Sequence, residues 1–181
     1  MQKYDHKKIE KNILNKNGRT AVFIDASNIY HSQKHLGFQI DFKKLLNYFK
    51  KETNLSSIYF YTAYDPEHKK QKSFLDFLEI IGYRVRTKKV KFIKDKDNES
   101  GGFHKGNLDV ELTMDVIENK NDYETLVLAS GDSDFAPLLQ LMKMKYGKIC
   151  VVMATKYSIS IELIKCAKYV NFTKLKKFIK K

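Results

Sequence analysis

Short apolar stretches alternate with amphipathic ones along most of the chain. Runs such as 20–24 and 149–153 are short, rich in β-branched residues and free of polar interruptions, which is typical of strands buried on both faces. Between such runs, apolar residues recur at helical spacing; within 41–51, Leu45 and Phe49 fall on one face. Strands that alternate with helices predict an α/β fold in which helices cover a mostly parallel sheet.

The same patterns predict where elements end. Alternation in 83–93 changes phase partway, which predicts a bulge or break, and the polar segment 94–103 predicts a loop. Asp65-Pro66 predicts a helix start with Asp65 as the N-cap, and Thr173 is a candidate cap for a short basic helix. In full, we predict strands at 20–24, 57–63, 83–93, 125–129, 149–153 and 169–172, and helices at 4–16, after Asn28, and at 41–51, 65–81, 107–118, 135–146 and 158–165.

Length and composition favour one folded domain with short extensions. The chain has 181 residues, of which 43% are hydrophobic and 13% aromatic. We divide it into a helical N-terminal extension (1–18), a main domain (19–173) and a basic tail (174–181). With no apolar run of about 18 residues and no signal-peptide pattern, we expect a cytoplasmic protein that does not span a membrane. Its two cysteines form no CxxC pair, which excludes zinc-finger and disulfide frameworks.

Charge points to a polyanionic partner. There are 34 Lys and Arg against 21 Asp and Glu, a net charge of +13, which favours nucleic acid or an anionic membrane surface. Arg84, Arg86 and Lys88 lie in one basic segment with Tyr83 and Phe92. A groove of cations and aromatic rings suits single-stranded RNA, whereas the plainer interpretation is charge that protects an edge strand from pairing.

The lysines of the basic tail leave three interpretations open. They alternate with Leu175, Phe178 and Ile179. This pattern fits a docking helix, an arm that contacts RNA, or a contact with another subunit or a protein partner. The sequence does not choose among them.

Carboxylates follow predicted strands at points where a parallel sheet forms ligand sites. Asp25 ends the run 20–24, Asp132 and Asp134 follow 125–129, and Asp109 opens a predicted helix. Oxygen ligands suit Mg²⁺ or Mn²⁺, and paired ions can activate water for phosphodiester hydrolysis. Without metal, such carboxylates would repel one another and a phosphate backbone.

Each acid also has a structural interpretation. An Asp between a strand and a helix is often only an N-cap, which explains Asp25, Asp132 or Asp134 singly. Asp109 can complement a helix dipole. Asp115 lies on another face of the same helix, in line with Glu111, where helical spacing predicts a solvated stripe.

Taken together, three segments resemble the NYN domain of the PIN-like nuclease superfamily, in particular its LabA-like group. They are FIDASNIY (23–30), KGNLDVELTMD (105–115) and VLASGDSDFAPLL (127–139), and SIELIKCAKYVNF (160–172) is similar to that group's closing helix and strand. The resemblance covers roughly 19–173. It implies a PIN-like Rossmannoid fold, a three-layer α/β/α sandwich.

The resemblance also implies a metal site and its residues. By position, Asp25, Asp109, Asp132 and Asp134 match metal-binding acids, Asn28 matches their polar partner, and Asp115 matches a second acid of the central motif, against its helical spacing. Lys105 and Ser130 are candidate substrate contacts, although Lys105 is also typical of a solvated loop. One extra residue separates Gly106 from Asp109 relative to the usual pattern.

We therefore expect a metal-dependent ribonuclease that uses Mg²⁺ or Mn²⁺ and acts on RNA, with single strands favoured. The alternative is a non-catalytic RNA-binding or regulatory module that keeps the fold. The retained acids favour the enzyme, because pure RNA binding would gain from their loss.

Overall fold

The computed structural model describes residues 18–94, 102–105 and 107–181. The predicted helix at 4–16 lies outside these residues. The main sheet has six parallel strands in the order β3-β2-β1-β6-β7-β8. Their bounds are β1 Arg19–Asp25, β2 Asn54–Tyr64, β3 Arg84–Lys89, β6 Thr125–Ala129, β7 Ile149–Ala154 and β8 Lys168–Asn171.

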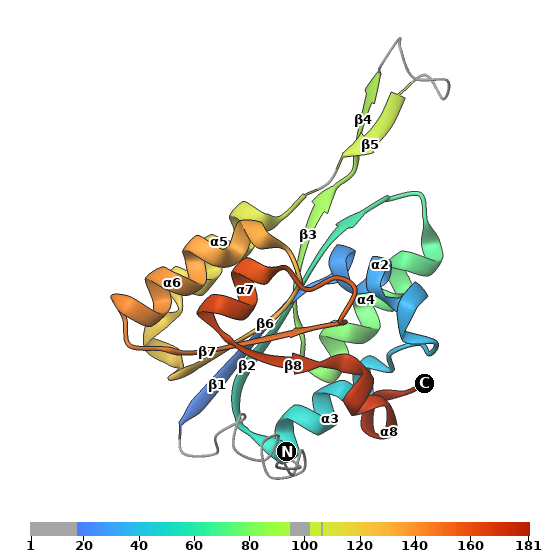
Figure 1. The fold of residues 1–181 in the computed structure, drawn as a ribbon. Coiled ribbons are helices and arrows are strands. Elements are labelled where there is room, and N and C mark those ends of the chain that lie inside the picture. Colours follow the sequence, from blue (N-terminus) through green and yellow to red (C-terminus); the bar gives the residue numbers. More distant parts are fainter. Residues whose placement is uncertain (1–17, 95–101, 106) are drawn as a thin grey trace.

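Helices cover both faces of this sheet (Figure 1). One layer contains α2 (Ala26–Leu36), α3 (Phe42–Glu52), α4 (Lys69–Ile81) and α8 (Lys176–Ile179), and the other α5 (Asp109–Glu118), α6 (Ala136–Met144) and α7 (Ile161–Cys166). Short 3-10 turns complete the chain at η1 (Lys120–Asp122), η2 (Ser133–Phe135) and η3 (Phe172–Leu175). The predicted three-layer α/β/α sandwich is confirmed.

Strand β1 shows why its apolar run has no polar interruption. Val22 and Ile24 pack in the core under the α3 layer, and Ala21 and Phe23 pack in the core under the α5 layer. All four side chains are fully buried. A central parallel strand buries both faces, so its sequence is apolar at every position.

The break predicted in 83–93 is also present. Strand β3 ends at Lys89, and after Val90 the chain enters β4 (Lys91–Lys94), which pairs antiparallel with β5 (Gly102–Lys105). This hairpin projects from the sandwich beyond the end of β3 (Figure 1). The predicted loop at 94–103 is therefore too long, since its ends belong to paired strands.

Two predicted caps are wrong. Helix α4 begins at Lys69 with His68 as N-cap, because the Asp65 carboxylate accepts a hydrogen bond from the Glu67 backbone N–H (3.0 Å) and forms a local turn instead. Asn171, rather than Thr173, caps η3: its Oδ1 accepts from the Thr173 N–H at 2.9 Å. In both places an Asp or Asn side chain accepts a hydrogen bond from a backbone N–H two residues later. The sequence pattern alone did not determine which turn that side chain would stabilise.

The basic tail folds back onto the domain. Leu175 and Ile179 are buried in the core, and α8 lies against α3. The Ile179 carbonyl accepts from the Asp41 N–H (2.8 Å), and the Lys181 N–H donates to the Gln39 carbonyl (2.9 Å). The apolar side of the tail therefore packs within its own chain. No helix among the described residues has the length and apolar character needed to cross a membrane.

This packing predicts unequal effects at neighbouring tail positions. Ile179→Ala should lower the free energy of unfolding by about 2–4 kcal/mol, because it opens a cavity at a fully buried site. Phe178→Ala, at a side chain 56% exposed, should cost well under half of that. Urea denaturation of both variants checks this, and equal losses would contradict the packing described.

Candidate metal centre

The predicted acids gather at the carboxyl end of the central strands. Asp25 is the last residue of β1, Asp132 and Asp134 follow β6, and Asp109 is the first residue of α5. Because β1 and β6 are parallel neighbours, their carboxyl ends share one edge of the sheet, where α/β proteins bind ligands.

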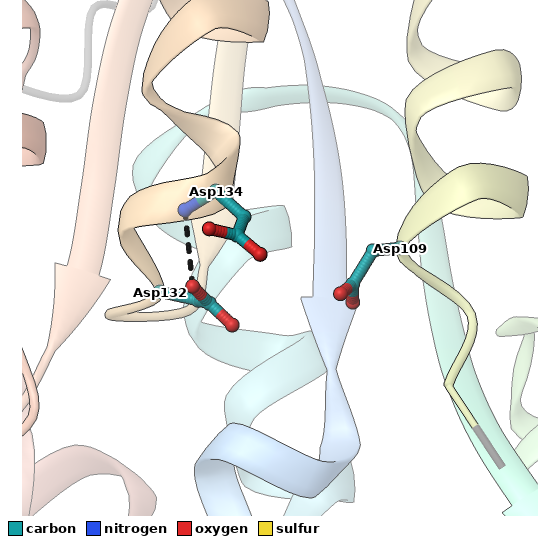
Figure 2. Close-up of side chains that lie close together, drawn as sticks. All are labelled: Asp109, Asp132 and Asp134. Carbon is teal, nitrogen blue, oxygen red and sulfur yellow. Dashed lines mark hydrogen bonds between the residues drawn. The ribbon is translucent and has the colours of Figure 1, made fainter.

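Three of these carboxylates form a compact group. Asp109, Asp132 and Asp134 each place one oxygen so that all three lie within 4.8 Å of one another. Figure 2 shows Asp109 reaching from the start of its helix toward the pair on the opposite turn. Asp109 and Asp132 are half-buried and Asp134 is exposed, so the group opens to solvent on one side.

Asp25 lies beside this group and is used differently. Its side chain is 7% exposed and acts as the N-cap of α2. Oδ1 accepts from the Ser27 hydroxyl (2.6 Å) and the Asn28 N–H (3.2 Å), and Oδ2 accepts from the Ser130 hydroxyl (3.0 Å). The capping interpretation is therefore correct for Asp25, and the cap still lies close enough to the other acids to influence them.

The electrostatics of Asp109 reflect this crowding. Burial raises the pKa of its carboxyl, a hydrogen bond from the Asn107 side chain (2.6 Å) opposes the rise, and the charges of Asp25, Asp132 and Asp134 add to it. In the folded, metal-free protein the charged form of Asp109 is thus disfavoured. A bound cation would relieve that repulsion.

A further set of hydrogen bonds shapes the turn after β6. The Ser130 hydroxyl donates to Asp25 and accepts from the Asp132 N–H (3.2 Å), and the Gly131 N–H donates to Asn28 Oδ1 (3.0 Å). Asp132 Oδ1 then accepts from the Asp134 N–H at 3.0 Å. Ser130 is 1% exposed, so its hydroxyl faces the protein rather than solvent.

Gly131 has a steric reason to be glycine. A Cβ at this position would lie 2.0 Å from the Ser158 carbonyl oxygen, which belongs to the backbone of the loop after β7. The same loop donates the Ser160 N–H to the Gly131 carbonyl at 3.0 Å. The turn that carries Asp132 is therefore packed directly against the loop that leads to α7.

Asp115 lies apart from the three-acid group. Its Oδ2 accepts from the Tyr61 hydroxyl (2.8 Å) and from Arg86 Nε (2.9 Å). Burial and this hydrogen bond raise the pKa of Tyr61 well above its usual range, which keeps its hydroxyl protonated as a donor. The prediction of a solvated stripe was therefore wrong for this residue: the Asp115 side chain is 14% exposed.

Arg86 and Lys88 join the edge strand to α5. Lys88 Nζ bonds Glu111 Oε1 at 2.6 Å, one helical turn from the Arg86–Asp115 pair. Residues two apart on a strand span about 6.6 Å and residues four apart on a helix about 6 Å, so the two pairs match in spacing. This ion-pair ladder holds β3 against α5, the helix that begins with Asp109.

Of the remaining predicted substrate contacts, Arg84 has a partner within the protein, whereas the side chain of Lys105 is not described. Arg84 donates to the Tyr59 hydroxyl (2.6 Å), and its guanidinium lies over that ring. All three cations of β3 predicted to bind RNA therefore have partners within the protein. Lys105 ends β5 opposite Lys91, but its side chain lies outside the part of the structure that is described.

Sequence reasoning missed Tyr61 and Asn107. Tyr61 lies in a buried apolar strand, and nothing in the pattern marks its hydroxyl as a partner of Asp115. Asn107 did carry a signal: an Asn two residues before Asp109 is typical of an Asx turn, and its Oδ1 accepts from the Asp109 N–H at 2.9 Å.

The parallel α/β sandwich, with carboxylates at the carboxyl end of its strands, defines a Rossmann-like protein with a candidate ligand site at that edge. Comparison with known proteins makes this specific. The chain belongs to the NYN domain family, a PIN-like nuclease family, whose model matches residues 19–175. The resemblance found in the sequence is thereby confirmed.

Two relatives illustrate the match. The chain is 36% identical over 167 residues to low amplitude and bright protein LabA of Synechococcus elongatus, covering 90% of this chain and 88% of that protein. It is also similar to the crystal structure of a protein of unknown function from Vibrio parahaemolyticus. That match has a TM-score of 0.71 and 26% identity, and covers 87% of this chain and 94% of the other.

The contact at Gly131 predicts a strong effect of one methyl group. Gly131→Ala should destabilise the protein by about 2–4 kcal/mol, because the loop backbone must move to admit Cβ. Gly147→Ala is the control: its added methyl meets nothing within 4 Å, and only its φ of 64° opposes it, at about 1 kcal/mol. Thermal and urea unfolding distinguish the two, and a smaller loss at Gly131 would contradict the close packing.

The raised pKa of Asp109 predicts a gain on neutralisation. In metal-free buffer at pH 7, Asp109→Asn should unfold at a higher temperature than wild type, by about 1–2 °C after allowance for solvent screening. The difference should shrink as the pH falls through the folded-state pKa of Asp109 and vanish below its unfolded-state pKa, because the carboxyl is then neutral in both states. Asp76→Asn, on the exposed side of α4, should show no such gain.

The partners of Asp115 predict a structural effect that is separate from metal binding. Asp115→Asn leaves Arg86 without its charge partner and should cost about 1–2 kcal/mol. Its unfolding temperature should still rise on adding Mn²⁺, as in wild type, whereas that of Asp132→Asn should not. Loss of the Mn²⁺ response in Asp115→Asn would instead make Asp115 a ligand, as the family resemblance implies.

Proposed function

We propose that this protein is a metal-dependent ribonuclease that hydrolyses RNA phosphodiester bonds at the Asp109–Asp132–Asp134 group. The observation that carries the proposal is the convergence of one oxygen from each of these three carboxylates within 4.8 Å. Membership of a PIN-like nuclease family supports it.

The donor set fits a hard divalent cation. All three groups offer carboxylate oxygen, which suits Mg²⁺ or Mn²⁺, and no histidine or cysteine belongs to the group among the described residues. Burial and then the charges of the neighbouring acids raise the pKa of Asp109, and a bound cation would offset both effects. We assign Asp109, Asp132 and Asp134 as ligands, with Asp25 behind them as the acid that anchors the turn and adds negative charge.

A divalent cation held by these three carboxylates would lower the pKa of a water molecule and place positive charge beside the phosphate. The chain's own residues fix where this happens. Asn107 orients the Asp109 carboxylate, and the backbone N–H of Asp134 orients that of Asp132. Asn28 accepts from Gly131 through Oδ1, which leaves its amide Nδ2 as the donor that we assign to orient water or substrate.

A direct cleavage assay tests the proposal. Purified protein is incubated with labelled single-stranded RNA and Mn²⁺, Mg²⁺ or EDTA, beside Asp109→Asn and Asp132→Asn prepared in the same way. We expect metal-dependent cleavage that falls at least about 100-fold in each variant, since loss of one ligand typically costs that much or more. Asp76→Asn should cleave like wild type.

The other outcomes are equally informative. Cleavage that persists in both variants would come from a contaminant or from another site, and would overturn this assignment. RNA bound but not cleaved under any metal condition would favour the alternative, an RNA-binding or regulatory module. In that case Asp132→Asn should bind RNA at least as tightly as wild type, because it loses a charge that repels phosphate, and both proteins should show the same thermal response to Mn²⁺.

A further inference from the structure

A cleft rich in lysine lies at the opposite end of the sheet from the carboxylates. Its volume is about 310 Å³, and its lining includes Lys143, Lys148, Lys165 and Lys168 around the thiols Cys150 and Cys166. It is formed where α6 and α7 end and where β7 and β8 begin. We call it the lysine cleft.

Two of the four ammonium groups are held in place by main-chain carbonyls. Lys148 Nζ donates to the Tyr123 carbonyl at 2.7 Å and lies 5.3 Å from the centre of that ring. Lys143 Nζ lies 3.4 Å from the Cys166 carbonyl. A carbonyl carries no formal charge, so these contacts place the two ammonium groups without pairing them with an acid.

The charge of the cleft is not balanced by carboxylates. Its lining contains no acid, and among the described residues the side-chain ion pairs involve Arg19, Arg86 and Lys88 instead. The pKa of Glu124 is lowered mainly by its hydrogen bonds with Arg19, and the charge of Lys148 adds only a smaller lowering. Arg86 and Lys88 of β3 are thus paired with acids within the fold, whereas the four lysines of the cleft are in no side-chain ion pair that the described residues form.

We propose that the lysine cleft binds phosphate groups of the RNA strand whose cleavage occurs at the carboxylates, an inference that rests on the proposed ribonuclease function. The acids repel a phosphate backbone, so affinity must come from cations placed away from them. Strand β7 alone spans roughly 20 Å between the two ends of the sheet. Only a strand of several nucleotides reaches both, so binding depends on RNA length.

Lysines at helix ends also have a purely structural use. Lys143 and Lys165 lie in the last turns of α6 and α7, where a cation stabilises the helix dipole. Lys50 and Lys51 occupy the last turn of α3, outside the cleft. They provide a control of equal charge that matches Lys165 in position at a helix end, whereas Lys168 is the first residue of β8.

The test measures RNA affinity in the Asp132→Asn background, so that cleavage does not interfere. Labelled single-stranded RNA of about 16 nucleotides is titrated by fluorescence anisotropy against Lys165→Glu/Lys168→Glu and against Lys50→Glu/Lys51→Glu. We expect about a 10-fold or greater loss for the cleft pair and about 2-fold for the control. The slope of log affinity against log salt should also fall by about 1.4, which corresponds to two phosphates. An RNA of about 4 nucleotides should bind all three proteins alike.

Each other result decides against the proposal or redirects it. Equal losses in both pairs would show only general charge attraction, and no loss in the cleft pair would remove the site; either overturns the inference. If the glutamate pair unfolds, as judged by its melting temperature, Lys165→Gln/Lys168→Gln replaces it at similar side-chain length.

Failure of the proposed function gives a distinct signature. If the parent protein binds no RNA at all, titration calorimetry with inorganic tripolyphosphate tests the cleft by itself. A heat of tripolyphosphate binding that is measured for wild type and lost in Lys165→Glu/Lys168→Glu would assign the site to a small phosphate compound. No heat in either would overturn it.

Discussion

Two hydrogen bonds join the end of β1 to the turn after β6, and the candidate site depends on them. Ser130 donates to the buried Asp25 carboxylate, and the Gly131 N–H donates to the Asn28 side chain. They fix the backbone from which Asp132 and Asp134 project. The missing side chain at Gly131 then lets the loop after β7 close on the same turn. Three carboxylates that repel one another can stay assembled because these hydrogen bonds hold the backbone of the turn and are mostly buried.

Asp109 reaches the group from a different direction, and a different kind of interaction holds it. It opens α5, which is buried against the sheet by Leu112 and Val116 and tied to the edge strand by the Arg86–Asp115 and Lys88–Glu111 pairs. The Lys88–Glu111 pair is exposed on both sides and contributes little stability, whereas the Asp115 carboxylate of the other pair is mostly buried. Their matched spacing on strand and helix nevertheless favours one position of α5, the helix that begins with Asp109, along β3.

Charge is distributed over this protein with a clear division of labour. The acids lie at the carboxyl end of the strands, and the lysine cleft lies at the amino end of β7 and β8. Arg84, Arg86 and Lys88 of β3 bond partners within the protein. A net charge of +13 therefore says little about where a polyanion would bind. That location depends on which cations lack an internal partner, and only packing decides this.

Apolar periodicity determined the layers and strand positions, because a parallel strand buried on both faces leaves a continuous apolar run such as 20–24. Asp25, Asp132 and Asp134 could likewise be chosen from the sequence, since parallel strands bring their carboxyl ends to one edge, and Asp109 could be chosen from its match to the family motif. The sequence did not determine which partner each polar side chain takes. Asp65 closes a turn instead of capping a helix, and Asp115 turns from solvent to Arg86 and Tyr61. Arg84, Arg86 and Lys88 meet residues 23 to 29 positions away. Hydrogen bonds and ion pairs are short-ranged and directional, so such choices are made only when the tertiary fold sets the distances.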